Sequence, residues 1–372
     1  MRLLVPERRS RMNPDKIILF SKQPGETSFA SLFTIKRALG TQKVGHTGTL
    51  DSFACGLLVV CAGNLTRLAS RITEMCKTYQ AVIRFGTETD TLECTGSVVR
   101  TAALPSKAAV EKALMQFRGA LMQRPPLFSA VHVAGRRASD VVRSGAIPVL
   151  PERQITVYDS QILEWKYADG GVSAVRVQFQ VSKGTYIRSL ARDIASACGS
   201  AAHLAGLYRT AVGAFSVKDA AGFDLLEEFT IDSVLCTAEK VCAAEKQRAC
   251  AEKDLSLRGI PKREWKTYLP KKNRSEETEA QLRMQVSEKA MCMNRALAEQ
   301  CGFACLTLHN DAETVFRNGG KLRSSMFTVS PLSVPEEYAA VFTADGRFAG
   351  LLHKNSSGFF EYAFVNADMR FL

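Results

Sequence analysis

The sequence lacks the short motifs with which many enzymes bind nucleotides or metal ions, and it lacks the motif that carries a catalytic serine. No GxGxxG follows an expected strand, and no GxxxxGK[ST] occurs, because residues 319–321 (Gly-Gly-Lys) continue with Leu322. No two of the five His residues are spaced as metal ligands, and no Gly-x-Ser-x-Gly segment is present. An enzyme built on this chain is therefore expected to work without a cofactor or a metal ion.

Long apolar runs and paired cysteines are also missing. No window is apolar over the roughly 20 residues that a membrane-spanning helix needs, and residues 1–6 are too short an apolar stretch for a secretory signal. The eleven Cys form no CxxC pair, and Cys301 and Cys305 have the wrong spacing for a zinc site. These absences predict a cytoplasmic protein with reduced, mostly buried thiols and no membrane partner.

Acidic residues are too few to balance the basic ones. Lys and Arg number 49 against 37 Asp and Glu, which gives a net charge of +12 and a pI of about 9.2. This excess indicates a polyanionic partner, namely RNA, DNA or an anionic membrane surface, although a merely basic soluble protein would show the same charge. The composition is otherwise that of a globular protein, and 372 residues suit two domains with some extra material.

Alternating and continuous apolar runs predict a sheet flanked by helices. Residues 17–20 and 57–61 are typical of buried strands, and residues 79–86 and 172–182 alternate as half-buried strands do. Strands and helices follow one another irregularly. This order favours an α+β fold with a mixed sheet over a doubly wound fold.

The segment after the first strand predicts a helix. Thr27 or Ser28 can cap its start, and Gly40 stands where a helix is expected to end. Phe29 and Phe33 recur at the four-residue spacing of one helix face. Phe29 and Phe33 are therefore expected, with Leu32 and Leu39, on the inner side of this helix.

The composition divides the chain into four parts. Residues 1–15 read as a basic N-terminal tail and residues 16–235 as a mixed-sheet domain. Residues 236–300 mix Lys, Arg and Glu with few large apolar residues, as a charged insert or linker does. Residues 301–372 contain short apolar stretches separated by turns, which is the rhythm of a small β-barrel.

Two segments place polar groups at the ends of apolar strands. Residues 45–51 (Gly-His-Thr-Gly-Thr-Leu-Asp) put Asp51 in a loop whose glycines allow close approach of a ligand. The alternative is an Asp that ends a turn or caps a helix. Residues 183–188 (Lys-Gly-Thr-Tyr-Ile-Arg) put two cations and an aromatic at a strand end, or simply form a solvated junction. Tyr79, which opens an amphipathic strand, is equally consistent with a packing residue.

These segments, with several others in order, resemble the bacterial tRNA pseudouridine-55 synthases, the TruB family. Residues 45–51 followed by Gly-Leu-Leu at 56–58 are similar to the catalytic motif of that family. The resemblance extends over residues 17–225 through Lys22, Pro24-Gly25, Tyr79, residues 85–91, Pro125-Pro126, Ser129-Ala130, residues 155–158 and residues 183–188. The sequence departs from the family pattern at Ser52-Phe53, where Pro-Leu is common, and at His132 and Ser139, where Lys and Tyr are typical.

The resemblance implies a fold and an activity. Residues 16–235 would form a pseudouridine synthase catalytic domain in which residues 121–151, rich in Arg and Pro, are an RNA-gripping insertion. Four arginines of this insertion would meet RNA phosphates, unless they are simply solvated charges: Arg124, Arg136, Arg137 and Arg143. Residues 301–372 would form a PUA-like RNA-binding barrel. The implied reaction isomerises a uridine in the T-loop of tRNA, at position 55 in tRNA numbering, after the base is flipped out of the RNA. The implied partner is the T-arm of tRNA, with no cofactor, metal or protein partner.

The resemblance also assigns roles to single residues. Asp51 matches the essential aspartate, which acts as a nucleophile on the sugar or as a base at C2′, and Arg188 matches the arginine that pairs with it. Tyr79 matches the aromatic that stacks on the flipped uracil. His46 matches the residue that fills the gap left by the flipped uracil. An alternative role for His46 is that of a general base in the reaction. Tyr186 and Leu207 match residues that line the pocket for the flipped uracil, although Leu207 also suits a plain core position.

Two rival functions stay open. One is a synthase that depends on a guide RNA and partner proteins, against which the insertion at 121–151 argues. The other is a tRNA-binding folding factor in which catalysis is secondary or lost. The presence of Asp51, Tyr79 and Arg188 together argues against a loss of catalysis.

Overall fold

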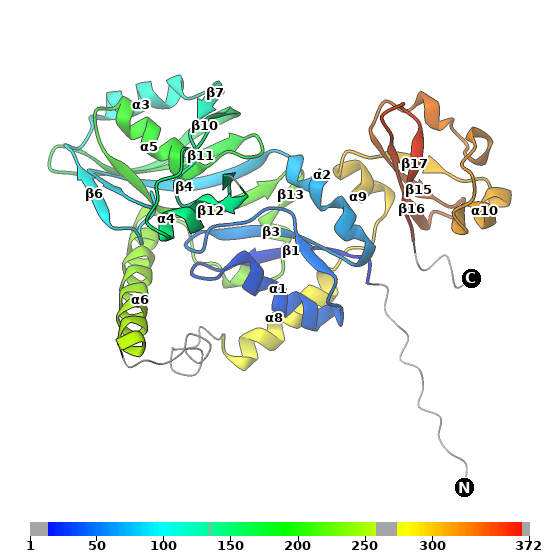
Figure 1. Ribbon diagram of the computed structural model, residues 1–372, viewed down its shortest axis with the longest axis horizontal. Coiled ribbons are helices and arrows are strands. Elements are labelled where there is room, and N and C mark those ends of the chain that lie inside the picture. The colour runs from blue at the N-terminus through cyan, green and yellow to red at the C-terminus, as the bar shows by residue number, and fades with distance from the viewer. Residues whose placement is uncertain (1–13, 134, 258–273, 367–372) are drawn as a thin grey trace, which may run out of the picture.

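The computed structural model describes residues 14–133, 135–257 and 274–366 (Figure 1). The expected tail at residues 1–15 therefore lies outside the described residues, except for its last two positions. The same holds for residues 258–273 of the expected charged insert at 236–300.

A nine-stranded mixed sheet forms the body of the protein. Strands β3 and β12 are parallel, and the other neighbouring strands are antiparallel. The expected α+β fold with a mixed sheet is thus confirmed. In spatial order the strands are β1 (Ile17–Lys22), β3 (Cys55–Ala62), β12 (Ala202–Val212), β4 (Lys77–Phe85), β11 (Gly171–Val181), β10 (Arg153–Ala168) and β7 (Gly119–Gln123), with β2 (Val44–His46) beside β3 and β13 (Phe215–Ser216) beside β12.

Along β4, every second side chain from Tyr79 to Phe85 enters one core cluster on one side of the sheet. On β4, Tyr79, Ala81, Ile83 and Phe85 are buried in one core cluster, while Arg84 is exposed. Helices α3 (Lys107–Gln116) and α5 (Ile187–Ala197) add their apolar faces to this cluster. The site described below is built on this rigid layer.

The remaining helices and strands are short or peripheral. Two small hairpins pair β5 (Thr87–Thr89) with β6 (Val98–Thr101) and β8 (His132–Val133) with β9 (Arg136–Arg137). The other helices are α2 (Ala69–Glu74), α4 (Ala138–Arg143), α6 (Ile231–Leu257), α8 (Glu276–Lys289), α9 (Arg295–Gln300) and α10 (Glu313–Arg317), with 3₁₀ turns at Gly63–Leu68, Val217–Asp219, Phe223–Leu225, Asn310–Ala312, Ser324–Met326 and Pro331–Ser333.

Helix α1 (Ser28–Leu39) has the expected ends and an unexpected orientation. Thr27 caps it by accepting a hydrogen bond from the Ala30 amide, and Gly40 ends it in the left-handed region at φ 62°. The prediction that Phe29 and Phe33 face inward is wrong, because their side chains are 61% and 55% exposed. The expected inward position of Leu32 is confirmed: it is buried together with Ile35, and small polar residues form the rest of the inner side.

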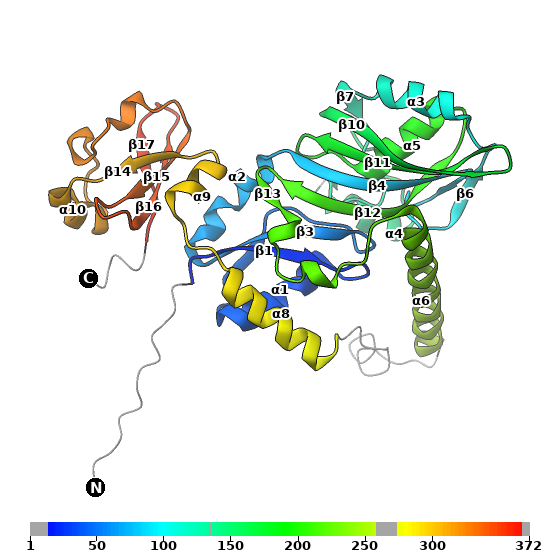
Figure 2. The ribbon, with the colours of Figure 1, turned by 180° about the vertical axis from the view of Figure 1, so that it is seen from behind.

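The orientation of α1 has a physical cause in its first residue. The Ser28 hydroxyl accepts a hydrogen bond from the Leu50 amide at 2.9 Å and donates one to the Leu50 carbonyl at 3.1 Å. These two bonds fix the rotation of the helix about its axis and turn Phe29 outward. Helix α8 then covers the flank of α1, with Leu282 and Val286 buried between them (Figures 1 and 2).

A separate four-stranded sheet follows near the C-terminal end, as expected for a small PUA-like domain. Its order is β14 (Ala304–Thr307), β15 (Tyr338–Phe342), β16 (Phe348–Lys354) and β17 (Phe360–Val365), and β14 and β15 are parallel. Phe342 and Phe364 belong to the same core cluster as Leu57 and Val212 of the large sheet. Figure 2 shows the two sheets side by side, joined through α2 and α9. In the part of the chain that the structure describes, no helix is both long and apolar enough to cross a membrane.

The cysteine environments predict an ordered pattern of alkylation. Burial raises the pKa of Cys61 and Cys301 to about 12, so these thiols stay protonated at pH 8. Cys236 and Cys292 are exposed. We expect iodoacetamide at pH 8 to modify the two exposed thiols at least about 100-fold faster than the two buried ones, as measured by peptide mass spectrometry. Equal rates for both groups in the folded protein, with a denatured sample as the reference, would contradict the packing described here.

Candidate active site

A cavity of about 500 Å³ opens beside the loop that precedes β3. Segments that are far apart in the sequence meet around it. Most of the lining comes from residues 48–52, Lys77 and Tyr79 on β4, the insertion at 121–151, residues 182 and 184–188, and Leu207 and Arg209 on β12. Five of the six site residues expected from the sequence line this cavity, and the sixth, His46, does not.

The carboxylate of Asp51 is paired with the guanidinium of Arg188. Arg188 Nη2 donates to Asp51 Oδ1 at 3.1 Å, and Arg188 Nε lies 3.0 Å from Asp51 Oδ2. The Arg188 side chain is 5% exposed, while that of Asp51 is 34% exposed. Since both carboxylate oxygens face one buried cation, the carboxylate is oriented and still open to the cavity.

Backbone carbonyls hold the other side of the Arg188 guanidinium. Nη1 donates to the Thr91 carbonyl at 2.9 Å, and Nη2 donates to the Phe128 carbonyl at 3.1 Å. Glu93 adds a second carboxylate 3.8 Å from Nη1. A planar group with several fixed donors is needed to reach all these acceptors, which explains an arginine at this position.

Two buried cations hold backbone carbonyls of the loop that carries the carboxylate and of β3, which follows it. Lys22 donates from Nζ to the Ser52 carbonyl at 3.3 Å, and burial lowers the pKa of this lysine from 10.5 to about 8. Arg209 donates from Nε to the Leu57 carbonyl at 2.7 Å and from Nη2 to the Gly48 carbonyl at 3.0 Å. These bonds connect the loop to β1 and β12, so its position depends on the sheet.

Aromatic and apolar groups form the other wall of the cavity. Tyr79 and Leu207 are 9% and 5% exposed and lie on the neighbouring strands β4 and β12. The Arg153 guanidinium lies over the Tyr186 ring, 4.4 Å from its centroid. The backbone of Tyr186 is fixed by Gln123, which accepts from its amide at 2.9 Å and donates to its carbonyl at 3.0 Å. The wall can therefore offer a flat, rigid surface to a planar ligand.

His46 lies on β2 and is half-buried. Burial, and then the nearby Arg209 charge, lower the pKa of His46 below its ordinary value of 6.5. The ring is therefore neutral at pH 7. Within the described residues, its Nδ1 atom has no hydrogen-bond partner.

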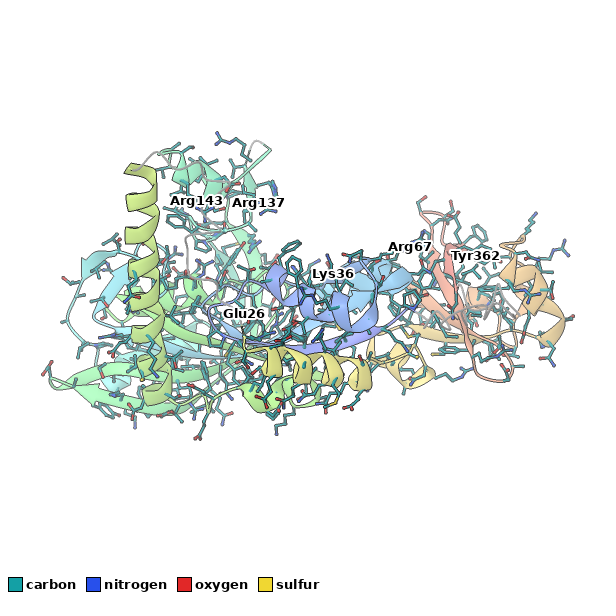
Figure 3. All side chains as sticks on the ribbon, turned by 90° about the horizontal axis from the view of Figure 1, so that it is seen from below. Glu26, Lys36, Arg67, Arg137, Arg143 and Tyr362 are labelled. Atoms are coloured by element: carbon teal, nitrogen blue, oxygen red, sulfur yellow. The ribbon has the colours of Figure 1, made fainter. Side chains whose placement is uncertain are left out.

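Positive charge dominates the cavity. The cationic lining residues are Lys77, Arg137, Arg143, Arg153, Arg188 and Arg209, and the acidic ones are Asp51 and Glu93. Figure 3 shows Arg137 and Arg143 on the insertion, which stands away from the body of the protein. A cavity of this charge attracts phosphate groups. Among the described residues, no group of three or more His, Cys, Asp or Glu side chains is placed to hold a metal ion.

The sequence did not predict that three of these cations lie at the cavity. Arg209 could have been found, because a charged side chain within the mostly apolar residues 202–212 must find hydrogen-bond acceptors when the strand is buried. Lys77 and Arg153 each begin a strand, where a solvated charge is the ordinary outcome. The sequence contains no signal that would have placed those two at the cavity.

The insertion carries two further arginines expected to meet RNA. Arg124 forms an ion pair with Glu152 at 3.2 Å, and Arg136 lies 3.5 Å from the Ser144 hydroxyl. Neither lines the cavity. Of the four arginines expected in this role, the structure thus brings Arg137 and Arg143 to the site.

Comparisons with known proteins agree on one family. The family model described as "TruB family pseudouridylate synthase (N terminal domain)" matches residues 36–187. The chain is 36% identical over 365 residues to the tRNA pseudouridine synthase B of Treponema pallidum, covering 93% of this chain and 96% of that protein. It is 47% identical over 235 residues to the protein of the same name from Treponema denticola, covering 59% of this chain and 66% of the relative.

A solved structure is similar in fold. The crystal structure of a Cbf5-Nop10-Gar1 complex aligns with a TM-score of 0.55 at 20% sequence identity, over 96% of this chain and 82% of that one. At this identity the likeness concerns the fold alone.

Proposed function

This chain belongs to the TruB family of pseudouridylate synthases, and we propose that it isomerises uridine to pseudouridine in tRNA, at the T-loop uridine of position 55. The observation that carries the proposal is the open carboxylate of Asp51, held by the buried Arg188 in a cavity whose other charges are mostly positive. Family membership and this geometry support the same reaction. The tRNA substrate, action in the cytoplasm and independence from protein partners are parts of this proposal.

The proposed reaction rearranges bonds within one nucleoside. The bond between N1 and C1′ breaks, a bond between C5 and C1′ forms, the proton on C5 leaves and N1 gains a proton. The mass is unchanged, so the balance requires no oxidant, reductant or group donor. The enzyme has to hold the detached uracil, turn it and rejoin it to the same sugar.

Asp51 is the proposed catalytic residue. An ionised carboxylate beside the sugar can attack C1′ as a nucleophile or remove a proton at C2′ as a base. Arg188 pairs with the carboxylate and fixes the direction of both oxygens. Because Asp51 is partly exposed to the cavity, a sugar can approach it without displacing the arginine.

The proposed base-binding wall consists of Tyr79, Tyr186 and Leu207. A uridine inside folded RNA has to be flipped out to reach Asp51, and unstacking is offset by stacking on an aromatic ring. His46 is proposed to occupy the gap left by the base. Its neutral ring can stack on nucleobases without the cost of burying a charge.

The test uses the purified chain alone and an unmodified tRNA transcript, with no cofactor added. We expect pseudouridine at a single T-loop uridine when the product is mapped chemically at nucleotide resolution. A matched transcript with cytidine at that position is the control and should stay unmodified. Tight binding without pseudouridine formation would contradict the stand-alone enzyme and favour the folding-factor or guide-dependent alternatives.

A further inference from the structure

Helix α1 exposes two phenylalanines that form one surface. The rings of Phe29 and Phe33 meet edge to face, with centroids 5.9 Å apart and an interplanar angle of 87°. The ammonium of Lys36 lies 5.7 Å and 5.8 Å from the two centroids. These three residues are spaced four and three positions apart, so they share one face of the helix. We call them the α1 platform.

The other sides of α1 are covered by the protein itself. Leu32 and Ile35 are buried against the sheet. On the flank, Thr34 donates to Glu279 at 3.0 Å and accepts from Arg274 at 3.3 Å. The platform is thus the face of the helix that is left to solvent.

Two acidic groups on this flank are paired with an arginine. Arg274 lies 2.5 Å from the Glu26 carboxylate and 3.5 Å from the Glu279 carboxylate. Lys36 therefore gives the platform a positive character, which suits a polyanion better than an acidic or apolar protein surface.

The platform adjoins the active-site loop. Ser28, which directly precedes Phe29, is hydrogen-bonded to the backbone of Leu50, and Leu50 directly precedes Asp51. In Figure 3, Lys36 is seen between Arg137 of the insertion and Arg67. An RNA that places a uridine at Asp51 would pass close to the platform.

We propose that the α1 platform stacks with an unpaired nucleotide of the RNA substrate that neighbours the target uridine, and that Lys36 contacts a phosphate. The proposal rests on the proposed function, because RNA is its occupant. Every base has a flat face that can stack on an aromatic ring, and a cation beside the ring can reach the backbone. Stacking would also remove two large apolar side chains from water, which accounts for a pair of phenylalanines at a surface.

The test measures binding without catalysis. Phe29→Ser and Phe33→Ser are introduced together into the Asp51→Asn protein, and the Kd is measured with an unmodified T-arm transcript. We expect the Kd to rise about 10- to 100-fold. The matched control is Tyr167→Ser, since Tyr167 is also 55% exposed and stacks on a neighbouring ring, that of Trp165, but lies on β10. The Kd of the Tyr167→Ser control should stay within about twofold of that of the Asp51→Asn parent, because no nucleobase is expected to stack on Tyr167.

A second variant and a spectroscopic readout keep the result interpretable. Phe33→Trp retains an aromatic face and should preserve or lower the Kd. A 2-aminopurine placed beside the target uridine should be quenched on binding to the Asp51→Asn protein and not to the double serine variant.

The proposal is overturned if the double serine variant binds the transcript within twofold of its parent. It is also overturned if that variant changes only the oligomeric state, which would make the platform a contact between two copies of this chain. Failure of the proposed function is distinguished from both outcomes. If the wild type forms no pseudouridine while the double serine variant loses affinity, the reaction is rejected and the RNA contact stands.

Discussion

Replacing Asp51 by Asn should lower the rate of pseudouridine formation by about 10⁴- to 10⁶-fold. Asn has the same shape and can still accept a hydrogen bond from Arg188, but it can neither attack C1′ nor remove a proton. Single-turnover measurements with saturating protein isolate the chemical step from binding. The Kd for tRNA should change by less than about fivefold, because the insertion and the cationic lining are untouched.

A matched control separates this loss from damage to the fold. Asp219→Asn makes the same chemical change at an exposed residue of a 3₁₀ turn that does not line the cavity. This variant should keep a rate within about twofold of the wild type. If Asp51→Asn retained more than a hundredth of the wild-type rate, another group would have to be the catalytic one, and the assignment of the carboxylate would be withdrawn.

The strands could be read from the sequence because their signal is local. Alternation at residues 79–86 and 172–182 and the continuous run at 57–61 gave β4, β11 and β3 at nearly their observed bounds. The order of these strands in the sheet could not be read in this way. Ala81 lies opposite Val177 on β11 and Leu207 on β12, and pairs so distant in the chain leave no periodic trace.

The meeting of Asp51 and Arg188 illustrates this limit. The two residues are 137 positions apart, and their contact depends on where β3 and the end of β11 lie in the finished sheet. Composition and spacing indicated only two polar strand ends. The family resemblance implied the pair, and the structure supplies the distances.

The orientation of α1 could not be predicted because its sequence is apolar on more than one side. Phe29 and Phe33 define one face by their spacing, and Leu32 and Ile35 define another. The periodicity alone does not show which of these two apolar faces packs against the rest of the protein. The hydrogen bonds between Ser28 and Leu50 decide between them, and they depend on a loop that lies outside the helix.

Replacing Arg188 by Met should have the second largest effect, and this effect should appear in both rate and stability. The Asp51 carboxylate would lose its cation, and the part-buried carbonyls of Thr91 and Phe128 would lose their donors. We expect a rate loss of about 10²- to 10³-fold and a decrease of about 3 kcal/mol in the free energy of unfolding. The rate and the free energy of unfolding of Arg188→Lys should lie between those of the wild type and Arg188→Met, because an ammonium cannot reach three acceptors in one plane.

The decisive measurement for this pair is a double-mutant cycle on the unfolding free energy. In an Asp51→Asn background, Arg188→Met should cost about 1 kcal/mol less than in the wild type, because no unpaired carboxylate is left behind. Arg192→Met, one turn further along α5 and paired with Asp193 at 2.8 Å, provides the control and should show no such coupling to Asp51. Equal costs of Arg188→Met in both backgrounds would mean that the guanidinium serves the two backbone carbonyls alone. The orientation of the carboxylate would then have to come from the loop bonds of Ser28, Lys22 and Arg209.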